Sequence, residues 1–278
     1  MPYLCKMKEG EHYLHGFTLK EQTRLYNQAR FLENIIYSGM DLSAVNNLLE
    51  VGSGVGAQTE IILRRFPDLK ITCVDFSDTQ IGAAKKRLDE NPVAKGRFEI
   101  LQMDAADMSF PSNEKYDGAF LCWILEHVPG PQNVLSEVRR VLLPNSRIYI
   151  TEVLNATFFL EPYSPNVLQY WMKFNDLQYE MGGDPFVGAK LGNLLLSLGY
   201  KDIQTEVKTF FLDNRNPGKR EEMIAYWTDL LLSGMPGLLK AGYVTGEVAE
   251  KVKQEMHIVA KDPNAVFFYS FVQASART

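Results

Sequence analysis

Short apolar runs alternate with segments of helical periodicity throughout residues 46–152, and this alternation restricts the chain to few folds. The apolar runs predict strands over residues 47–51, 69–76, 97–103, 116–122 and 147–153, and the segments between them predict helices over 58–66, 79–91 and 131–142. Strands joined by helical crossovers pair in parallel, because the helix carries the chain back to the same end of the sheet. We therefore expect an α/β fold with a mostly parallel sheet and helices on both faces.

The segments on either side of this core predict more helices and the last strands of the sheet. Further helices are expected over 18–38, 188–198 and 217–264, and two further strands over 202–212 and 265–274, which bring the sheet to seven strands. Residues 154–186 are rich in aromatic side chains. No linker rich in proline, glycine or serine interrupts the chain, so we expect a single domain. Its parts are an N-terminal helical arm at 1–45, a ligand-binding core at 46–153, and lid helices with the last strands at 154–278.

Charge and cysteine content argue against several classes of protein. The chain has 278 residues and a formal net charge of -5, with no stripe of lysine and arginine to neutralise nucleic-acid phosphates. The three cysteines, Cys5, Cys73 and Cys122, are far apart, so neither a disulfide framework nor a metal site is expected. No apolar run reaches the roughly 18 residues of a membrane span, and the first residues do not resemble a signal peptide. We expect a cytoplasmic protein with no nucleic-acid or membrane partner.

A glycine-rich turn follows the first predicted strand, in the run Leu49-Glu50-Val51-Gly52-Ser53-Gly54-Val55-Gly56. Glycines let the backbone of such a turn approach a ligand closely, and the helix that follows presents unpaired N–H groups. The spacing of Gly52, Gly54 and Ala57 also fits the turn of dinucleotide-binding proteins. The turn alone therefore predicts a nucleotide or nucleoside site and does not decide which ligand occupies it.

Three acidic residues at the ends of consecutive predicted strands narrow the choice of ligand. Glu50 precedes the turn, where its charge would repel a pyrophosphate but is compatible with the sulfonium and ammonium groups of S-adenosylmethionine. Asp75 ends the next strand, at the usual position of the acid that accepts hydrogen bonds from ribose hydroxyls. Asp104 follows the third strand, where a carboxylate can accept from an adenine amine, although aspartate also caps turns. The three acids favour a nucleoside with positive charge.

Taken in order, these motifs resemble those of class I S-adenosylmethionine-dependent methyltransferases, in the small-molecule branch typified by the ubiquinone and menaquinone C-methyltransferases. The stretches that carry the resemblance are residues 49–56, Val74-Asp75-Phe76-Ser77, Met103-Asp104-Ala105, residues 116–120 and Leu125-Glu126-His127-Val128. The resemblance covers residues 46–153 and implies a Rossmann-like fold that binds S-adenosylmethionine. One departure is Pro144-Asn145-Ser146, where the family often has Pro-Gly-Gly. Asparagine tolerates positive φ, so we expect the turn to form.

The resemblance also implies a set of cofactor-binding residues. In that family the glycine-rich turn shapes the site for the methionine and ribose, the acid after the second strand binds the ribose, and the residues after the third strand reach the adenine. The fourth strand ends beside the amino group of the methionine. The corresponding residues here are Glu50, Gly52, Gly54, Gly56, Asp75, Phe76, Asp104, Ala105 and Cys122.

Two histidines are the candidate catalytic residues. Methyl transfer from a sulfonium mainly needs proximity and alignment, and sometimes a general base. His127 follows the fourth predicted strand and His15 precedes the N-terminal arm, so either can approach the transferred methyl group. Packing or capping at the start of a helix would explain His127 equally well, and a surface turn would explain His15. Glu152, Arg24 and Tyr26 are weaker candidates for contact with the acceptor or the cofactor.

The aromatic residues after the fifth predicted strand suggest an apolar or aromatic acceptor. Their position, and that of the helices around Trp227, predicts a lid over the acceptor, although core packing would explain any one of them. We therefore expect methyl transfer to a hydrophobic small molecule. The alternatives are an NAD(P)-dependent oxidoreductase, a protein that binds the cofactor without methylating, and methylation of a protein acceptor. Residues 24–37 are a possible surface for a homodimer.

Overall fold

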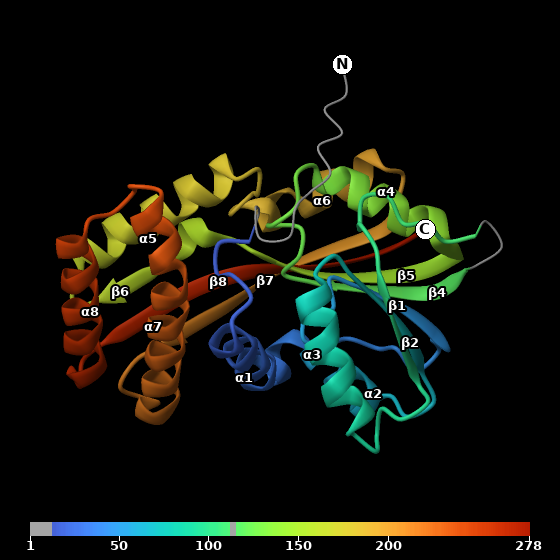
Figure 1. The fold of residues 1–278 in the computed structure, drawn as a ribbon, viewed down its shortest axis with the longest axis horizontal. Helices are drawn as coiled ribbons and strands as arrows, with labels where there is room; N and C mark the ends of the chain where they lie inside the picture. The colour runs from blue at the N-terminus through green and yellow to red at the C-terminus, as the bar shows by residue number, and fades with distance from the viewer. Residues whose placement is uncertain (1–12, 112–114) are drawn as a thin grey trace.

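The computed structural model describes residues 13–111 and 115–278, and its centre is an eight-stranded sheet (Figure 1). The strand order is β3-β2-β1-β4-β5-β8-β6, and β7 pairs with the other edge of β8. Strands β1 to β5 are mutually parallel, whereas β8 runs antiparallel to its three neighbours. The strands are β1 Asn47–Val51, β2 Lys70–Asp75, β3 Phe98–Gln102, β4 Tyr116–Cys122, β5 Leu142–Val153, β6 Phe159–Glu161, β7 Lys201–Leu212 and β8 Val266–Arg277.

Helices cover both faces of the sheet, and each face has its own apolar core. Figure 1 shows α4 and α6 on one side of the sheet, and α1, α2 and α3 on the other. The buried side chains form two separate clusters that match these two layers. The helices are α1 Leu19–Ile36, α2 Ala57–Arg65, α3 Asp78–Asp89, α4 Pro131–Val141, α5 Pro165–Glu180, α6 Leu191–Ser197, α7 Pro217–Lys240 and α8 Gly246–Lys261, with 3-10 turns at Asn155–Thr157 and Val187–Lys190. The predicted α/β architecture, with a mostly parallel sheet between helical layers, is confirmed.

The sheet has one strand more than predicted. All seven expected strands are present, but the short β6 adds an eighth, where the chain leaving β5 returns along β8. The helical structure expected over 217–264 is present as two helices, because Gly242 adopts a left-handed conformation with φ 76° and ends α7. The side chain of Thr245 then accepts from the N–H of Val248 and caps the start of α8.

The turn that departs from the usual Pro-Gly-Gly sequence forms as expected. Asn145 has φ 64°, a conformation that asparagine tolerates better than most residues. The pairing of β4 with β5 shifts register at this point, between Tyr116 and Gly118. The turn therefore forms with Asn-Ser in place of Gly-Gly, as an irregularity within β5.

The N-terminal arm packs against its own chain. The side chain of Thr18 caps α1, and α1 contacts both α2 and α7. Its buried face includes the charged residues Glu21 and Arg24, together with Leu32 and Ile36. A homodimer through residues 24–37 therefore has only the outer face of α1 to use, and dimer formation stays a prediction.

Candidate functional site

A cavity of about 260 Å³ lies at the carboxyl ends of β1, β2 and β4. Open parallel sheets bind ligands at this edge, where the loops leaving the strands diverge. Nine of the eleven residues expected in the site line the cavity, and Glu50 and Gly56 do not. The nine are His15, Gly52, Gly54, Asp75, Phe76, Asp104, Ala105, Cys122 and His127.

The three glycines of the turn have different structural roles. All have positive φ, of 74° at Gly52, 52° at Gly54 and 71° at Gly56. A Cβ on Gly52 would lie 2.5 Å from Cδ1 of Ile124, in the loop after β4, and one on Gly56 would lie 3.0 Å from Leu88 in α3. A Cβ on Gly54 would meet nothing within 4 Å. Gly54 therefore leaves room for a ligand, whereas Gly52 and Gly56 allow neighbouring elements to approach the turn.

Glu50 lies beneath the turn and supports it. Its Oε2 accepts a hydrogen bond of 2.6 Å from Oγ1 of Thr59 in α2, and Sγ of Cys73 in β2 donates to the same atom at 3.5 Å. The side chain is buried, which raises the pKa of the carboxyl from 4.5 to about 7. Glu50 thus joins β1 to α2 and β2.

The raised pKa of Glu50 predicts a pH-dependent stability. The folded state binds this proton more tightly than the unfolded state, so the contribution is complete below pH 4.5 and is lost as the pH rises through about 7. We expect Glu50 to lower the free energy of unfolding by about 2 kcal/mol between pH 5 and pH 8. Glu50→Gln should remove that fraction of the pH dependence, measured by urea denaturation at both pH values.

The matched control for this prediction is Glu99→Gln, because Glu99 is an exposed glutamate of β3. Its substitution should leave the pH dependence of stability unchanged. If the Glu50→Gln protein loses as much stability between the two pH values as the unsubstituted protein does, Glu50 is not the group that titrates.

The two aspartates of the site hold loops as well as lining the cavity. One Asp75 oxygen accepts from the backbone N–H of Gly54 at 2.7 Å, and the other accepts from that of Ser77 at 2.9 Å. Oδ1 of Asp104 accepts from the N–H of Ala106 at 2.8 Å, which is the turn-capping role considered above. Both carboxylates still border the cavity, next to the apolar side chain of Phe76. This combination of acids with a flat apolar wall suits a nucleoside.

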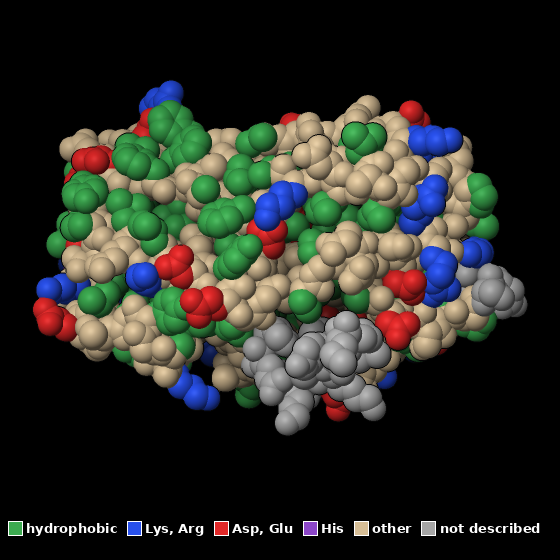
Figure 2. Space-filling model, turned by 90° about the horizontal axis from the view of Figure 1, so that it is seen from above, with side chains coloured by type: hydrophobic (Ala, Val, Ile, Leu, Met, Phe, Trp, Pro, Cys, Tyr) green, Lys and Arg blue, Asp and Glu red, His purple; other side chains and the backbone are tan. Residues whose placement is uncertain are grey.

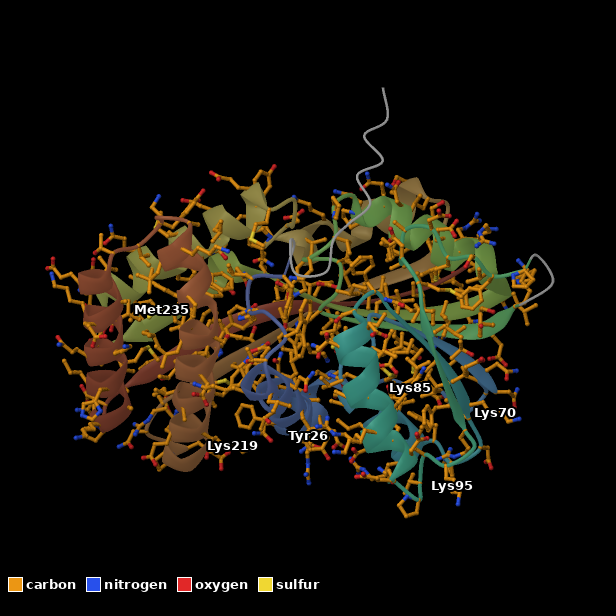
Figure 3. All side chains as sticks on the ribbon, in the orientation of Figure 1. Tyr26, Lys70, Lys85, Lys95, Lys219 and Met235 are labelled. Carbon is orange, nitrogen blue, oxygen red and sulfur yellow. The ribbon has the colours of Figure 1, made fainter. Side chains whose placement is uncertain are left out.

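The segment before α1 crosses the cavity and closes one side of it. Tyr13 stacks on Phe17 with ring centroids 5.3 Å apart and donates to Glu21 at 2.8 Å. Arg24 also lines the cavity, and its guanidinium forms a buried ion pair with Glu21. Tyr26, which is labelled on α1 in Figure 3, does not line the cavity. Its hydroxyl donates to Glu60 in α2. Of the two arm residues considered, only Arg24 is placed to meet a ligand.

His15 is held in one tautomer by α7. Its Nδ1 lies 2.6 Å from Oγ of Ser233. That hydroxyl also donates to the carbonyl of Leu230 at 2.7 Å, which leaves its lone pairs to accept from His15. Nδ1 of His15 therefore carries the proton, and Nε2 keeps its lone pair. Burial, together with the nearby Arg24 and His127, lowers the pKa of His15 well below 6.5, so the ring is neutral at physiological pH.

His127 has a different environment from His15. Its ring meets the Tyr13 ring edge-on at 5.0 Å, and Nε2 lies 3.6 Å from a carboxylate oxygen of Glu126. Gln178 donates to the other oxygen of Glu126 at 2.8 Å. His127 therefore lines the first cavity beside an anchored carboxylate.

Glu152 does not line the cavity. It is fully buried, and Oε1 accepts from the backbone N–H groups of Ile124 at 3.0 Å and Leu125 at 2.7 Å. Burial and the neighbouring Glu126 raise the pKa of this carboxyl well above 4.5. Glu152 was a candidate for contact with the acceptor, but here its carboxyl supports the neighbouring backbone.

A second, smaller cavity of about 60 Å³ adjoins the first and is mainly aromatic. Five residues line both cavities and mark the junction between them, namely His15, Gln28, Trp123, Glu126 and Leu230. The walls of the second cavity include Trp171 and Phe174 of α5, Trp227 and Tyr226 of α7, and Phe271 of β8. The aromatic segment and α7 therefore surround a compartment, as the lid interpretation requires. The same side chains also pack in the hydrophobic core, since the Trp227 ring stacks on that of Phe158 with centroids 4.5 Å apart.

Trp123, Glu126 and Tyr226 were not expected among the site residues. Glu126 and Tyr226 belong to segments that the sequence singled out, but nothing in the pattern indicates that they face a cavity. Trp123 has φ 54°, which is rare for a bulky side chain and leaves no signal in the sequence.

Within the described ranges, no group of three histidine, cysteine, aspartate or glutamate side chains is arranged to hold a metal ion. None of the described helices is long and apolar enough to cross a membrane. Cys73 and Cys122 are unpaired, Cys73 buried and Cys122 half-buried at the cavity, whereas Cys5 lies outside the described residues.

Comparison with known proteins identifies relatives of the core and of the fold. The family model described as a methyltransferase domain matches residues 49–150. An O-methyltransferase of Aspergillus nomiae, rstn1, is 30% identical over 168 residues, which cover 60% of this chain and 70% of that protein. The highly reducing polyketide synthase pspA of Penicillium soppii is 27% identical over 217 residues, which cover 74% of this chain and 8% of that protein. The chain thus spans a small part of the synthase and most of the O-methyltransferase.

A solved structure shares the fold over most of the chain. The [4+2]-cyclase SpnF superposes with a TM-score of 0.56 at 18% sequence identity, covering 90% of this chain and 82% of that one. At this identity the likeness supports the architecture and carries no inference about activity.

Proposed function

From the premise that this chain belongs to the class I S-adenosylmethionine-dependent methyltransferases, we propose that it transfers a methyl group from that cofactor to a hydrophobic or aromatic small molecule. The observation that carries the proposal is the junction of two cavities. A compartment with nucleoside-binding features opens, at His15, Trp123 and Glu126, into one walled by aromatic rings.

The residues of the first cavity fit the proposed cofactor. Ser53 lines the cavity, and its buried Oγ has no hydrogen-bond partner among the described residues. Open space above Gly54 admits close approach to the backbone. We assign Asp75 to the ribose hydroxyls, Asp104 and Ala105 to the adenine edge, and Phe76 to its face. The end of β4 at Cys122 borders the methionine part.

The second cavity is assigned to the acceptor. Its aromatic walls favour a flat apolar molecule, which gains from burial and from ring contacts. Binding there directs the acceptor toward the junction and excludes water around the transferred methyl group. When bound, S-adenosylmethionine supplies an electrophilic methyl group, so the protein contributes mainly proximity and alignment.

His15 is proposed as the general base. It lines both cavities, and its Nε2 lone pair is free because Nδ1 donates to Ser233. It would take the proton from the acceptor atom that becomes methylated. His127 lines only the first cavity, beside Glu126, and is assigned to orienting the acceptor or the cofactor at the junction.

A labelled-methyl experiment tests this function. The protein is incubated with S-adenosylmethionine carrying a deuterated methyl group and a metabolite extract, and products are identified by mass spectrometry. We expect a labelled apolar or aromatic product. Binding of S-adenosylhomocysteine without any labelled product would point instead to a protein that binds the cofactor but does not methylate. Labelling of added proteins alone would replace the small acceptor with a macromolecular one.

A cytoplasmic location is also part of the proposal, supported by the unpaired thiols of Cys73 and Cys122, which persist in reducing compartments. No nucleic-acid partner is proposed. On the face seen in Figure 2, acidic side chains lie beside the basic ones. Sedimentation analysis tests the possible homodimer.

A further inference from the structure

Trp123 has an unfavourable backbone conformation immediately after β4. Its φ is 54°, in the left-handed region that a bulky side chain seldom adopts because of steric strain. Its N–H donates to the carbonyl of Thr151 at 2.9 Å, which extends the pairing of β4 with β5 up to this residue. The surrounding structure must therefore stabilise the turn that follows.

Glu152 supplies that stabilisation. One of its carboxylate oxygens accepts from the N–H groups of Ile124 and Leu125, the two residues that follow Trp123. The side chain is fully buried, so without it these N–H groups would lose their partner away from water. Glu152 thus fixes the direction of the chain on leaving Trp123.

The conformation of Trp123 decides where its indole lies. The ring borders both the cofactor cavity and the aromatic cavity, and it meets the Phe271 ring edge-on at 6.2 Å. The next residue, Ile124, is packed so close to the glycine-rich turn that a Cβ on Gly52 would lie 2.5 Å from it. The loop is therefore held from three sides, by β5, β8 and the turn.

We propose that Glu152 is a positioning residue that acts through Trp123, holding the indole as the wall between the cofactor and acceptor compartments. The position of that wall admits flat, uncharged rings, which lie against the indole with one edge at His15. This inference rests on the proposed function for the identity of the two compartments. The roles of Glu152 and Trp123 can nevertheless be tested without knowing the acceptor.

The experiment is a double-mutant cycle read out by calorimetry with 2-naphthol, a flat uncharged probe, and separately with S-adenosylhomocysteine. Glu152→Met removes both acceptor oxygens at similar volume, Glu152→Gln keeps one, and Trp123→Ala removes the indole. We expect Glu152→Met to weaken naphthol binding about tenfold and S-adenosylhomocysteine binding less than about twofold. Glu152→Gln should restore naphthol affinity to within about threefold, and in the Trp123→Ala background Glu152→Met should have almost no further effect.

Several results would overturn the proposal. One is a Glu152→Met effect of equal size with and without Trp123, and another is an equal loss of affinity for both ligands. Failure of the unsubstituted protein to bind naphthol is a third. If Glu152→Met does not fold, amide hydrogen exchange of Ile124 and Leu125 decides instead. Slow exchange of both amides is expected in the unsubstituted protein and in Glu152→Gln. Fast exchange in the folded unsubstituted protein would show that Glu152 does not hold these two N–H groups. Failure of the proposed function has a different signature, namely no labelled product although the naphthol cycle behaves as expected.

Discussion

Replacing Gly52 by alanine is expected to weaken S-adenosylhomocysteine binding at least about 100-fold. Two effects add at this position. Alanine at φ 74° costs about 1–2 kcal/mol in left-handed strain. Its Cβ would also lie 2.5 Å from Cδ1 and 2.8 Å from Cβ of Ile124, so the loop after β4 must move. That loop carries Trp123, Glu126 and His127, which line the cavity. Moving the loop therefore changes the shape of the cavity wall as well as the turn itself.

Calorimetric titration with S-adenosylhomocysteine measures this effect, and Gly96→Ala is the matched control. Gly96 has a similar φ of 73°, but a Cβ there meets nothing within 4 Å, and it lies outside the cavity. The control should show comparable backbone strain and less than about a twofold change in affinity. A Gly52→Ala protein that binds within about threefold of the unsubstituted protein would show that the contact with Ile124 does not shape the site.

The sequence predicted those parts of the fold that depend on local pattern. Periodicity and β-branched runs located the strands of the core, and the order of the glycine-rich turn, Asp75 and Asp104 led to the family that the comparisons confirm. The same family membership decides against the dinucleotide interpretation of Gly52, Gly54 and Ala57. These features were predictable because each is encoded in neighbouring residues.

The remaining features depend on contacts between distant residues. Glu50 was expected at the ligand, but it turns inward because Thr59 and Cys73, on other elements, offer it hydrogen bonds. The positive φ of Trp123 depends on a carboxylate that lies 29 positions later, at Glu152. Partners at such separation leave no periodic signal in the sequence.

Substitution of His15 by glutamine should lower kcat about 10²–10⁴-fold with the acceptor identified by labelling, the range usual for loss of a general base. Glutamine keeps polarity and approximate size but cannot take the proton. Because cofactor binding does not need the base, affinity for S-adenosylhomocysteine should change less than about threefold. His127→Gln is the control, and we expect it to lose much less of kcat, since His127 does not reach the second cavity.

Ser233→Ala tests the same base through its tautomer. Without the hydroxyl that accepts from Nδ1, His15 can place its proton on Nε2, where it blocks catalysis, so kcat should fall about tenfold. The pH profile gives an independent readout. The pKa of His15 is lowered by burial and by nearby positive charge, so above that pKa the ring is neutral and can accept a proton. We therefore expect kcat/KM to decline only as the pH falls below 6.5. Equal losses from His15→Gln and His127→Gln, or a His15→Gln enzyme with more than a third of the original kcat, would remove His15 from the reaction and leave methyl transfer here to proximity and alignment alone.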